Sequence, residues 1–124
     1  MFELTVAAYM DSAHFLRGYH GKCAGVHGHS WKVEATVSGE RLNSLGLLID
    51  FHDLKKNVQK AIGTFDHKLI NDIEPFDKIN PTSENLAKHL FWEIKDNLAA
   101  YPGIKLVRVL VSESRDTSAV YYEK

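Results

Sequence analysis

The chain has 124 residues, a formal net charge of -1 at pH 7, 44% hydrophobic residues and one cysteine. This length predicts a single domain, residues 1–124, with a real hydrophobic core, and the balanced charge gives no field that would attract nucleic acid or an anionic membrane. The lack of a long apolar run or a signal peptide predicts a cytoplasmic protein, and a lone cysteine excludes an internal disulfide.

The N-terminal third of the chain predicts two β-strands joined by a long loop. Apolar side chains alternate at even positions over residues 2–14 and at odd positions over residues 27–38, as is typical of half-buried antiparallel strands. Residues 15–26 are punctuated by glycines and too long for a tight hairpin, so they predict a loop of the kind that often carries chemistry. His14 and His29 fall on the apolar faces of the two strands and should meet at one end of the sheet.

A metal site is the first functional hypothesis for this region. His27 and His29 are separated by one residue, so on a strand both rings project from the same face, about 7 Å apart along the chain. His14 supplies a third ligand if its strand pairs antiparallel with theirs. Three histidines with an open fourth position are typical of a catalytic zinc site. The alternative is a histidine-rich turn without metal.

Cys23 lies four positions before His27, and three roles are open to it. A lone cysteine near histidines in an intracellular protein is a candidate nucleophile or base. Cysteine is also a good zinc ligand, and with the three histidines it would form a closed structural site. The third role is that of a buried apolar residue. The flanking glycines, Gly21 and Gly25, favour a mobile base over a fixed ligand.

The rest of the chain predicts two helices followed by two strands. Asp50 is expected to cap the first helix and Thr82 the second. Residues 106–112 and 118–122 are expected to form the last two strands. The apolar stripe of the first helix is predicted to consist of Phe51, Leu54, Val58, Ala61 and Ile62.

This order of elements predicts an α+β fold, β-β-α-α-β-β, in which two helices cover one face of a four-stranded antiparallel sheet. Long edge strands in such a sheet tend to be paired or capped. We therefore expect subunit association to use these edges, so that the working unit is a homo-oligomer.

Six short motifs follow one another along the chain. They are Ser12-Ala-His14-Phe, Cys23-x-x-x-His27-Gly-His29, Leu48-Ile-Asp50-Phe, Phe65-Asp66-His67-x-Leu69-Ile-Asn71, Pro81-Thr82-Ser83-Glu84-Asn85 and Val111-Ser112-Glu113. With these motifs the chain resembles, over essentially its whole length, the 6-pyruvoyl-tetrahydropterin synthase family of the tunnelling fold (T-fold). The three residues between Cys23 and His27 resemble its bacterial 6-carboxy-tetrahydropterin synthase branch most closely.

The resemblance implies a role for each residue of the opening motifs. His14, His27 and His29 would hold Zn²⁺ and leave a position open for the hydroxyl groups of a pterin side chain. Cys23 would act as a thiolate base, since a nearby metal ion and cationic histidine lower a thiol pKa.

The resemblance implies roles for three residues further along the chain. Asp66 and His67 would form a proton relay, although the pair alone would be interpreted as a surface turn. Glu113 would anchor the pterin through its ring amide N–H and 2-amino group, the alternative being a solvated strand end. Basic residues near the motifs are the candidates for contacts with a triphosphate tail: Arg17, Lys22, Lys68 and Arg115.

The activity that the resemblance implies is a zinc-dependent lyase reaction. It would convert 7,8-dihydroneopterin triphosphate to 6-carboxy-5,6,7,8-tetrahydropterin, with release of triphosphate and acetaldehyde, on the deazapurine route to queuosine. One alternative stops at the 6-pyruvoyl product, and an alternative of another class is a non-catalytic zinc-binding assembly module. The family suggests a hexamer of two stacked trimers with active sites at subunit boundaries.

Overall fold

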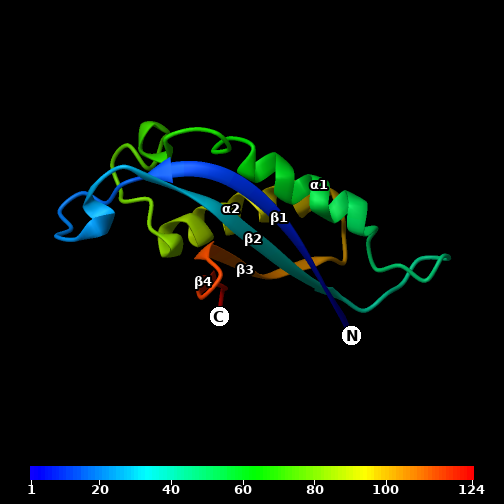
Figure 1. The fold of residues 1–124 in the computed structure, drawn as a ribbon. Helices are drawn as coiled ribbons and strands as arrows, with labels where there is room; N and C mark the ends of the chain where they lie inside the picture. The colour runs from blue at the N-terminus through cyan, green and yellow to red at the C-terminus, as the bar shows by residue number, and fades with distance from the viewer.

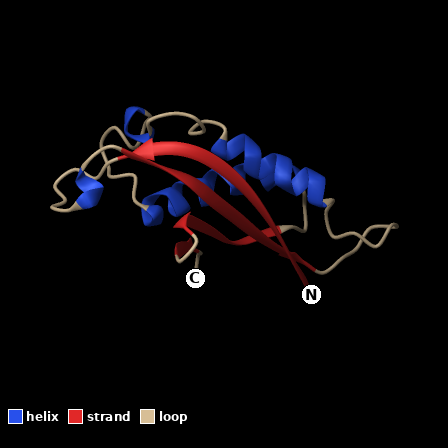
Figure 2. Cartoon of the chain, viewed as in Figure 1, coloured by secondary structure: helices blue, strands red, loops and turns tan.

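The computed structural model describes the backbone of residues 1–124 and every side chain except that of Cys23. Four antiparallel strands form one sheet in the order β1-β2-β3-β4. Two α-helices follow β2, so the predicted α+β architecture is confirmed (Figures 1 and 2). The strands are β1 (Phe2–His14), β2 (His27–Gly39), β3 (Lys105–Ser114) and β4 (Thr117–Tyr121), and the α-helices are α1 (Phe51–Ile62) and α2 (Ser83–Asn97).

Both helices pack on the same face of the curved sheet and leave the other face uncovered (Figure 1). The predicted parities are confirmed, because alternate residues of β1 and β2 are buried beneath the helices. Burying apolar area in this layer is the main source of stability, at roughly 25 cal/mol per Å². The largest fully buried side chains include Trp31, Phe65, Phe76, Phe91, Met10, Leu54 and Leu90.

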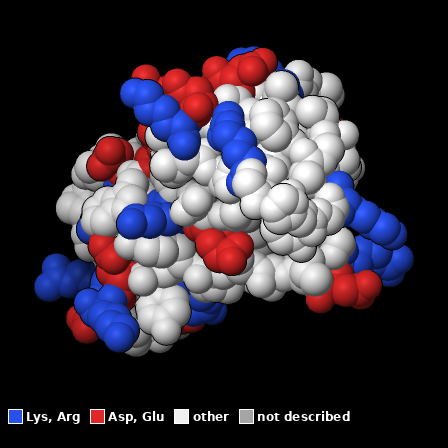
Figure 3. Space-filling model, turned by 90° about the vertical axis from the view of Figure 1, so that its left-hand side faces the viewer, with Lys and Arg blue, Asp and Glu red and all other residues white. Residues whose placement is uncertain are grey.

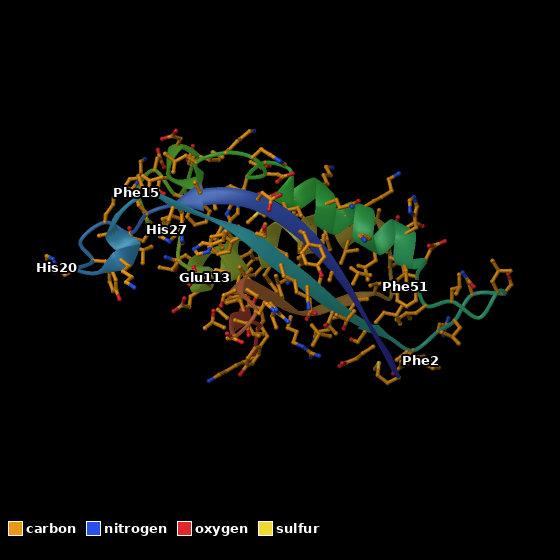
Figure 4. The ribbon with its side chains drawn as sticks, in the orientation of Figure 1. Phe2, Phe15, His20, His27, Phe51 and Glu113 are labelled. Atoms are coloured by element: carbon orange, nitrogen blue, oxygen red, sulfur yellow. The ribbon has the colours of Figure 1, made fainter. Side chains whose placement is uncertain are left out.

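The helix caps are those that the sequence predicts. The Asp50 side chain accepts a hydrogen bond from the His52 N–H at 2.7 Å, and the Thr82 hydroxyl accepts one from the Asn85 N–H at 3.1 Å. The prediction that Phe51 belongs to the buried stripe of α1 is wrong, since its side chain is 58% exposed. Phe51 is the first residue of the helix and lies at its outer end, beyond the core (Figure 4).

Short 3-10 turns fill parts of the predicted loops. They are η1 (Lys22–Ala24), η2 (Ile70–Asp72) and η3 (Leu98–Ala100). The strand β3 extends beyond its predicted ends, so Glu113 lies within it. No helix among the residues that the structure describes is long and apolar enough to cross a bilayer.

Candidate metal centre

The pairing of β1 with β2 brings three histidines together at one end of the sheet. His14 lies directly opposite His27, and His29 lies opposite Ser12. The ring centroids of the three histidines are 4.6 to 5.2 Å apart, and one nitrogen from each ring lies within 4.8 Å of the others. This is the convergence that the strand parities predict, and the three side chains could hold a metal ion.

Two of these rings are oriented by backbone carbonyl groups. His14 Nδ1 lies 2.8 Å from the Pro81 carbonyl oxygen, and His27 Nδ1 lies 2.7 Å from that of Gly25. A carbonyl oxygen only accepts, so each Nδ1 carries the ring proton and each Nε2 presents a lone pair. Such bonds are typical of metal-binding histidines, where they fix the tautomer and the ring orientation.

The two oriented Nε2 atoms, of His14 and His27, face each other at 3.1 Å. Two lone pairs at this distance repel unless a cation lies between them. In a tetrahedral zinc site with bonds of 2.0 to 2.1 Å, ligand nitrogens are about 3.3 Å apart. The spacing and tautomers therefore fit a shared metal ion.

His29 supplies the third nitrogen, which lacks a partner. Its Nε2 is buried and has no hydrogen bond among the described side chains. The nearest acceptor, Glu113 Oε2, lies 3.4 Å away, which makes it a charge contact and not a well-formed hydrogen bond. An unsatisfied buried polar atom costs about 1 to 3 kcal/mol, and coordination to a metal would remove that cost.

Burial favours the neutral form of two of these histidines. Burial lowers the pKa of His14, with a further lowering from His27 and His29, and outweighs the opposing effects of the Pro81 carbonyl and Glu113. Burial likewise lowers the pKa of His29 against the opposing charge of Glu113. A metal binds the neutral imidazole, so both shifts favour coordination near neutral pH.

Glu113 reaches the same centre from β3. Its Oε2 atom lies 3.4 Å from His29 Nε2 and 3.6 Å from His14 Nε2, and its side chain is 32% exposed. His27 and Glu113 lie at the same end of the sheet, remote from Phe2 and Phe51 (Figure 4). This end of the molecule carries interspersed positive and negative side chains (Figure 3).

An open cavity of about 960 Å³ borders the centre. Its lining includes His29, Glu113 and the β3–β4 turn, and its size suits a small molecule. A second cavity of about 800 Å³ lies at the end of α2 and contains none of the predicted site residues. The cavity beside the histidines is therefore the better candidate for a substrate site.

Asp66 and His67 form the predicted pair, but at the outer edge of β1. His67 Nδ1 lies 3.0 Å from Asp66 Oδ1, which also accepts the Asp11 N–H at 2.9 Å. That backbone bond, with a smaller contribution from His67, lowers the pKa of Asp66. His67 is 77% exposed, and no bond among the described side chains joins the pair to the metal centre.

The backbone of His67 adopts a left-handed conformation, with φ at 59°. This conformation is uncommon for a residue other than glycine, and it is supported by the bond from the His67 N–H to the Asp11 carbonyl oxygen at 2.7 Å. Such strain tends to concentrate at functional sites. The backbone from which the exposed imidazole projects is thus held by a specific contact.

Cys23 lies in η1, and its side chain lies outside the described residues, so its predicted role stays a prediction. The turn is closed by a bond from the Ala24 N–H to the Gly21 carbonyl oxygen at 3.1 Å. The next residue, Gly25, provides the carbonyl that orients His27. The turn that carries the cysteine is therefore linked directly to a ligand of the candidate metal centre.

Sequence reasoning missed the groups that surround the histidines. The carbonyls of Gly25 and Pro81 are backbone groups and leave no signal in side-chain patterns. Trp31, predicted only as an apolar position, packs edge-on against His14 and His29, at centroid distances of 4.8 and 5.2 Å. Its N–H donates to the Ser12 carbonyl oxygen at 3.0 Å, which fixes the indole beneath the site.

Comparison with known proteins identifies the family of this chain. A model of the family described as 6-pyruvoyl tetrahydropterin synthase matches residues 3–124. The chain belongs to this family. It is 37% identical over 133 residues to 6-carboxy-5,6,7,8-tetrahydropterin synthase from Bacillus subtilis, covering 99% of this chain and 86% of that protein. A protein of the same name from Synechocystis is 32% identical over 117 residues, covering 90% and 86%.

A solved structure confirms the fold independently. The 6-pyruvoyl tetrahydropterin synthase of Caenorhabditis elegans superposes with a TM-score of 0.87 at 24% identity, covering 99% of this chain and 96% of that one. The resemblance predicted from the six motifs, and the T-fold that it implied, are both confirmed.

Proposed function

We propose that this chain is a zinc-dependent 6-carboxy-5,6,7,8-tetrahydropterin synthase. It would convert 7,8-dihydroneopterin triphosphate to 6-carboxy-5,6,7,8-tetrahydropterin and release triphosphate and acetaldehyde. The observation that carries the proposal is the pair of Nδ1–carbonyl bonds that turn the Nε2 atoms of His14 and His27 toward each other. The names of the curated relatives support the same reaction.

In this proposal His14, His27 and His29 hold Zn²⁺. Three neutral imidazoles with an unfilled fourth position are the ligand set of catalytic zinc. When bound, the ion supplies Lewis acidity to the hydroxyl and carbonyl oxygens of the pterin side chain. The carbonyls of Pro81 and Gly25 hold the first two rings in the tautomer that can bind it.

Proton transfer is assigned to Cys23 and to the Asp66–His67 pair. Cys23 as a thiolate would take a proton from the pterin side chain on one side. Asp66 holds the His67 Nδ1 atom, which leaves Nε2 free to exchange a proton with a substrate. Because His67 points to solvent from the edge of β1, we propose that it serves the site of a neighbouring subunit.

Glu113 is assigned to substrate binding. An ionised carboxylate accepts two parallel N–H donors, which is the pattern that the pterin ring presents through its amide N–H and 2-amino group. Glu113 lies on the border of the cavity and beside His29, so a pterin bound to it would have its side chain next to the metal. The same proposal includes a cytoplasmic homo-oligomer, a hexamer of two stacked trimers, that acts in the queuosine pathway.

Product analysis tests the proposal. Purified protein is incubated with 7,8-dihydroneopterin triphosphate, the pterin product is identified by mass spectrometry, and acetaldehyde is assayed in parallel. The expected result is the 6-carboxy product with an equal amount of acetaldehyde. A 6-pyruvoyl product without acetaldehyde would identify the alternative reaction that stops at that product. An unchanged substrate with a zinc-loaded protein would indicate the non-catalytic module.

A further inference from the structure

The orientation of His14 depends on a segment remote in sequence. His14 is the last residue of β1, is only 2% exposed, and bonds through Nδ1 to the carbonyl of Pro81, 67 residues further on. Pro81 lies in the irregular segment between η2 and α2. The orientation of His14 therefore depends on how firmly that segment is attached to the end of β1.

Asn80, the residue before Pro81, makes this attachment. Its side-chain oxygen accepts the Arg17 N–H at 2.8 Å, and its NH₂ group donates to the Arg17 carbonyl oxygen at 3.0 Å. The amide thus binds both backbone groups of one residue, as a neighbouring strand would. On the other side, Asn85 Nδ2 donates to the Asn80 carbonyl oxygen at 2.9 Å.

Asn71, in η2, makes the same pair of bonds to Phe15, two residues before Arg17. It is 3% exposed, accepts the Phe15 N–H at 2.9 Å and donates to the Phe15 carbonyl oxygen at 3.0 Å. Phe15 directly follows His14. Two side-chain amides therefore hold the chain immediately beyond the ligand.

Arg17 joins these two attachments. Its guanidinium donates to the carbonyl oxygens of Phe76 at 3.0 Å, Ile79 at 3.4 Å and Asn71 at 3.5 Å, and it lies over the Phe15 ring at 5.2 Å. The positive charge of Arg17 is therefore already used in contacts within the protein. The candidate role of Arg17 in binding a triphosphate tail is accordingly less well supported than a structural one.

We propose that Asn80, with Arg17 and Asn71, is a positioning residue for the metal centre. The network holds the Pro81 carbonyl against His14 Nδ1, and so keeps the Nε2 lone pair of His14 directed at the metal. This inference rests on the proposed function, because it assumes that His14 is a ligand. Groups that orient ligating histidines typically change metal affinity by roughly 10- to 100-fold when they are removed.

The test measures metal affinity in Asn80→Ala against Asn97→Ala. Asn97 is a matched control, because it is also half-buried and its amide also donates to a backbone carbonyl, that of Asn57 at 3.2 Å, between the two helices. The metal is removed, Zn²⁺ is titrated against a competing chelator, and Co²⁺ is used to record the ligand-field spectrum. Unfolding is measured for both variants without metal.

The expected result is a 10- to 100-fold loss of Zn²⁺ affinity and an altered Co²⁺ spectrum in Asn80→Ala only. Asn80→Asp keeps the acceptor for the Arg17 N–H and should recover part of the affinity. If Asn80→Ala does not fold, Asn85→Ala removes a single bond of the same network and should show the smaller loss.

Equal affinity in Asn80→Ala, Asn97→Ala and the unmodified protein would overturn the inference. A loss of Zn²⁺ affinity that parallels the loss of metal-free stability in both variants would also overturn it. A residue with only a structural role would behave in this way. These outcomes differ from a failure of the proposed function, in which the unmodified protein itself binds no zinc or gives no product.

Discussion

The Glu113 carboxylate lies 3.4 Å from His29 Nε2, although the two side chains come from different strands, β3 and β2. The distance is too long for a strong hydrogen bond, and the histidine nitrogen has no other partner among the described residues. Two roles are compatible with this contact. Glu113 either anchors the pterin beside the metal or completes the metal site itself.

Glu113→Gln separates these roles. The change keeps the shape of the side chain but replaces one acceptor with a donor that faces the donors of the pterin. We expect pterin binding to weaken by about 2 to 3 kcal/mol, the scale of a hydrogen bond to a charged group. Zinc content should be unchanged. Both quantities are measured on one preparation, by titration calorimetry and elemental analysis, and a fall in zinc with intact pterin affinity would make Glu113 a ligand.

His27→Ala tests the metal centre directly. A ligand that binds only the folded state stabilises it, by about 2.7 kcal/mol when present at a hundred times its dissociation constant. Added Zn²⁺ should therefore raise the unfolding temperature of the unmodified protein and leave that of His27→Ala unchanged. His20→Ala is the control, because it removes an exposed histidine from the loop that precedes β2. A zinc-induced shift that persists in His27→Ala would contradict the assigned ligand set.

The sequence predicts the histidine cluster but not the groups around it, and the difference has a physical basis. The alternation of β1 and β2 determines which residues share a face, so His14, His27 and His29 are assigned from period and parity alone. The pairing of Asn80 with Arg17 spans 63 residues and depends on how an irregular segment packs. No periodic pattern encodes such a contact. The prediction for Phe51 is wrong for a related reason, because the periodicity of a helix does not show where the core ends.

We expect the half-buried His89, which is not one of the candidate metal ligands, to make the protein less stable in acid. Its ring packs against Phe65 and Phe76 at 5.6 and 5.5 Å, and burial lowers its pKa below the ordinary value of 6.5, against the opposing effect of Glu93. The unfolded chain therefore binds a proton before the folded chain does. The free energy of unfolding should fall as the pH drops below about 6.5.

His89→Phe should reduce this dependence, because it keeps an aromatic ring and removes the titrating group. The measurement is urea unfolding of metal-free protein between pH 7.5 and 5.5, with the slope compared between the variant and the unmodified chain. His14 and His29 contribute to the slope in both proteins and do not affect the comparison. Identical slopes would show that His89 titrates alike in both states.

The sheet edges predict association. The strands β1 and β4 are the outer strands of the sheet. Within the described residues β1 is covered at its end, where the Ala13 N–H donates to the Lys68 carbonyl oxygen at 3.0 Å and the His67 N–H donates to that of Asp11 at 2.7 Å. Uncovered strands of this length are usually paired. Sedimentation should show a species larger than the 14.0 kDa chain. A stable monomer with full activity would refute both the oligomer and the proposed place of His67 in a neighbouring site.

The last prediction concerns Cys23, whose turn adjoins Gly25 and so the bond that orients His27. If Cys23 is the base, Cys23→Ala should retain zinc and pterin binding and lose about two to four decades of turnover, the usual contribution of a positioned general base. If it is a fourth ligand, the site is closed and structural, and the same change should reduce zinc affinity.

Zinc stoichiometry and single-turnover rates are measured together for Cys23→Ala and Cys23→Ser. Serine is a poor zinc ligand and a weak base at neutral pH, so it resembles alanine on either hypothesis and checks that the result does not arise from the smaller side chain. A zinc-replete, pterin-binding and slow protein supports the base. A protein that purifies without zinc supports the closed site, and with it a chain that binds metal for structure and not for catalysis.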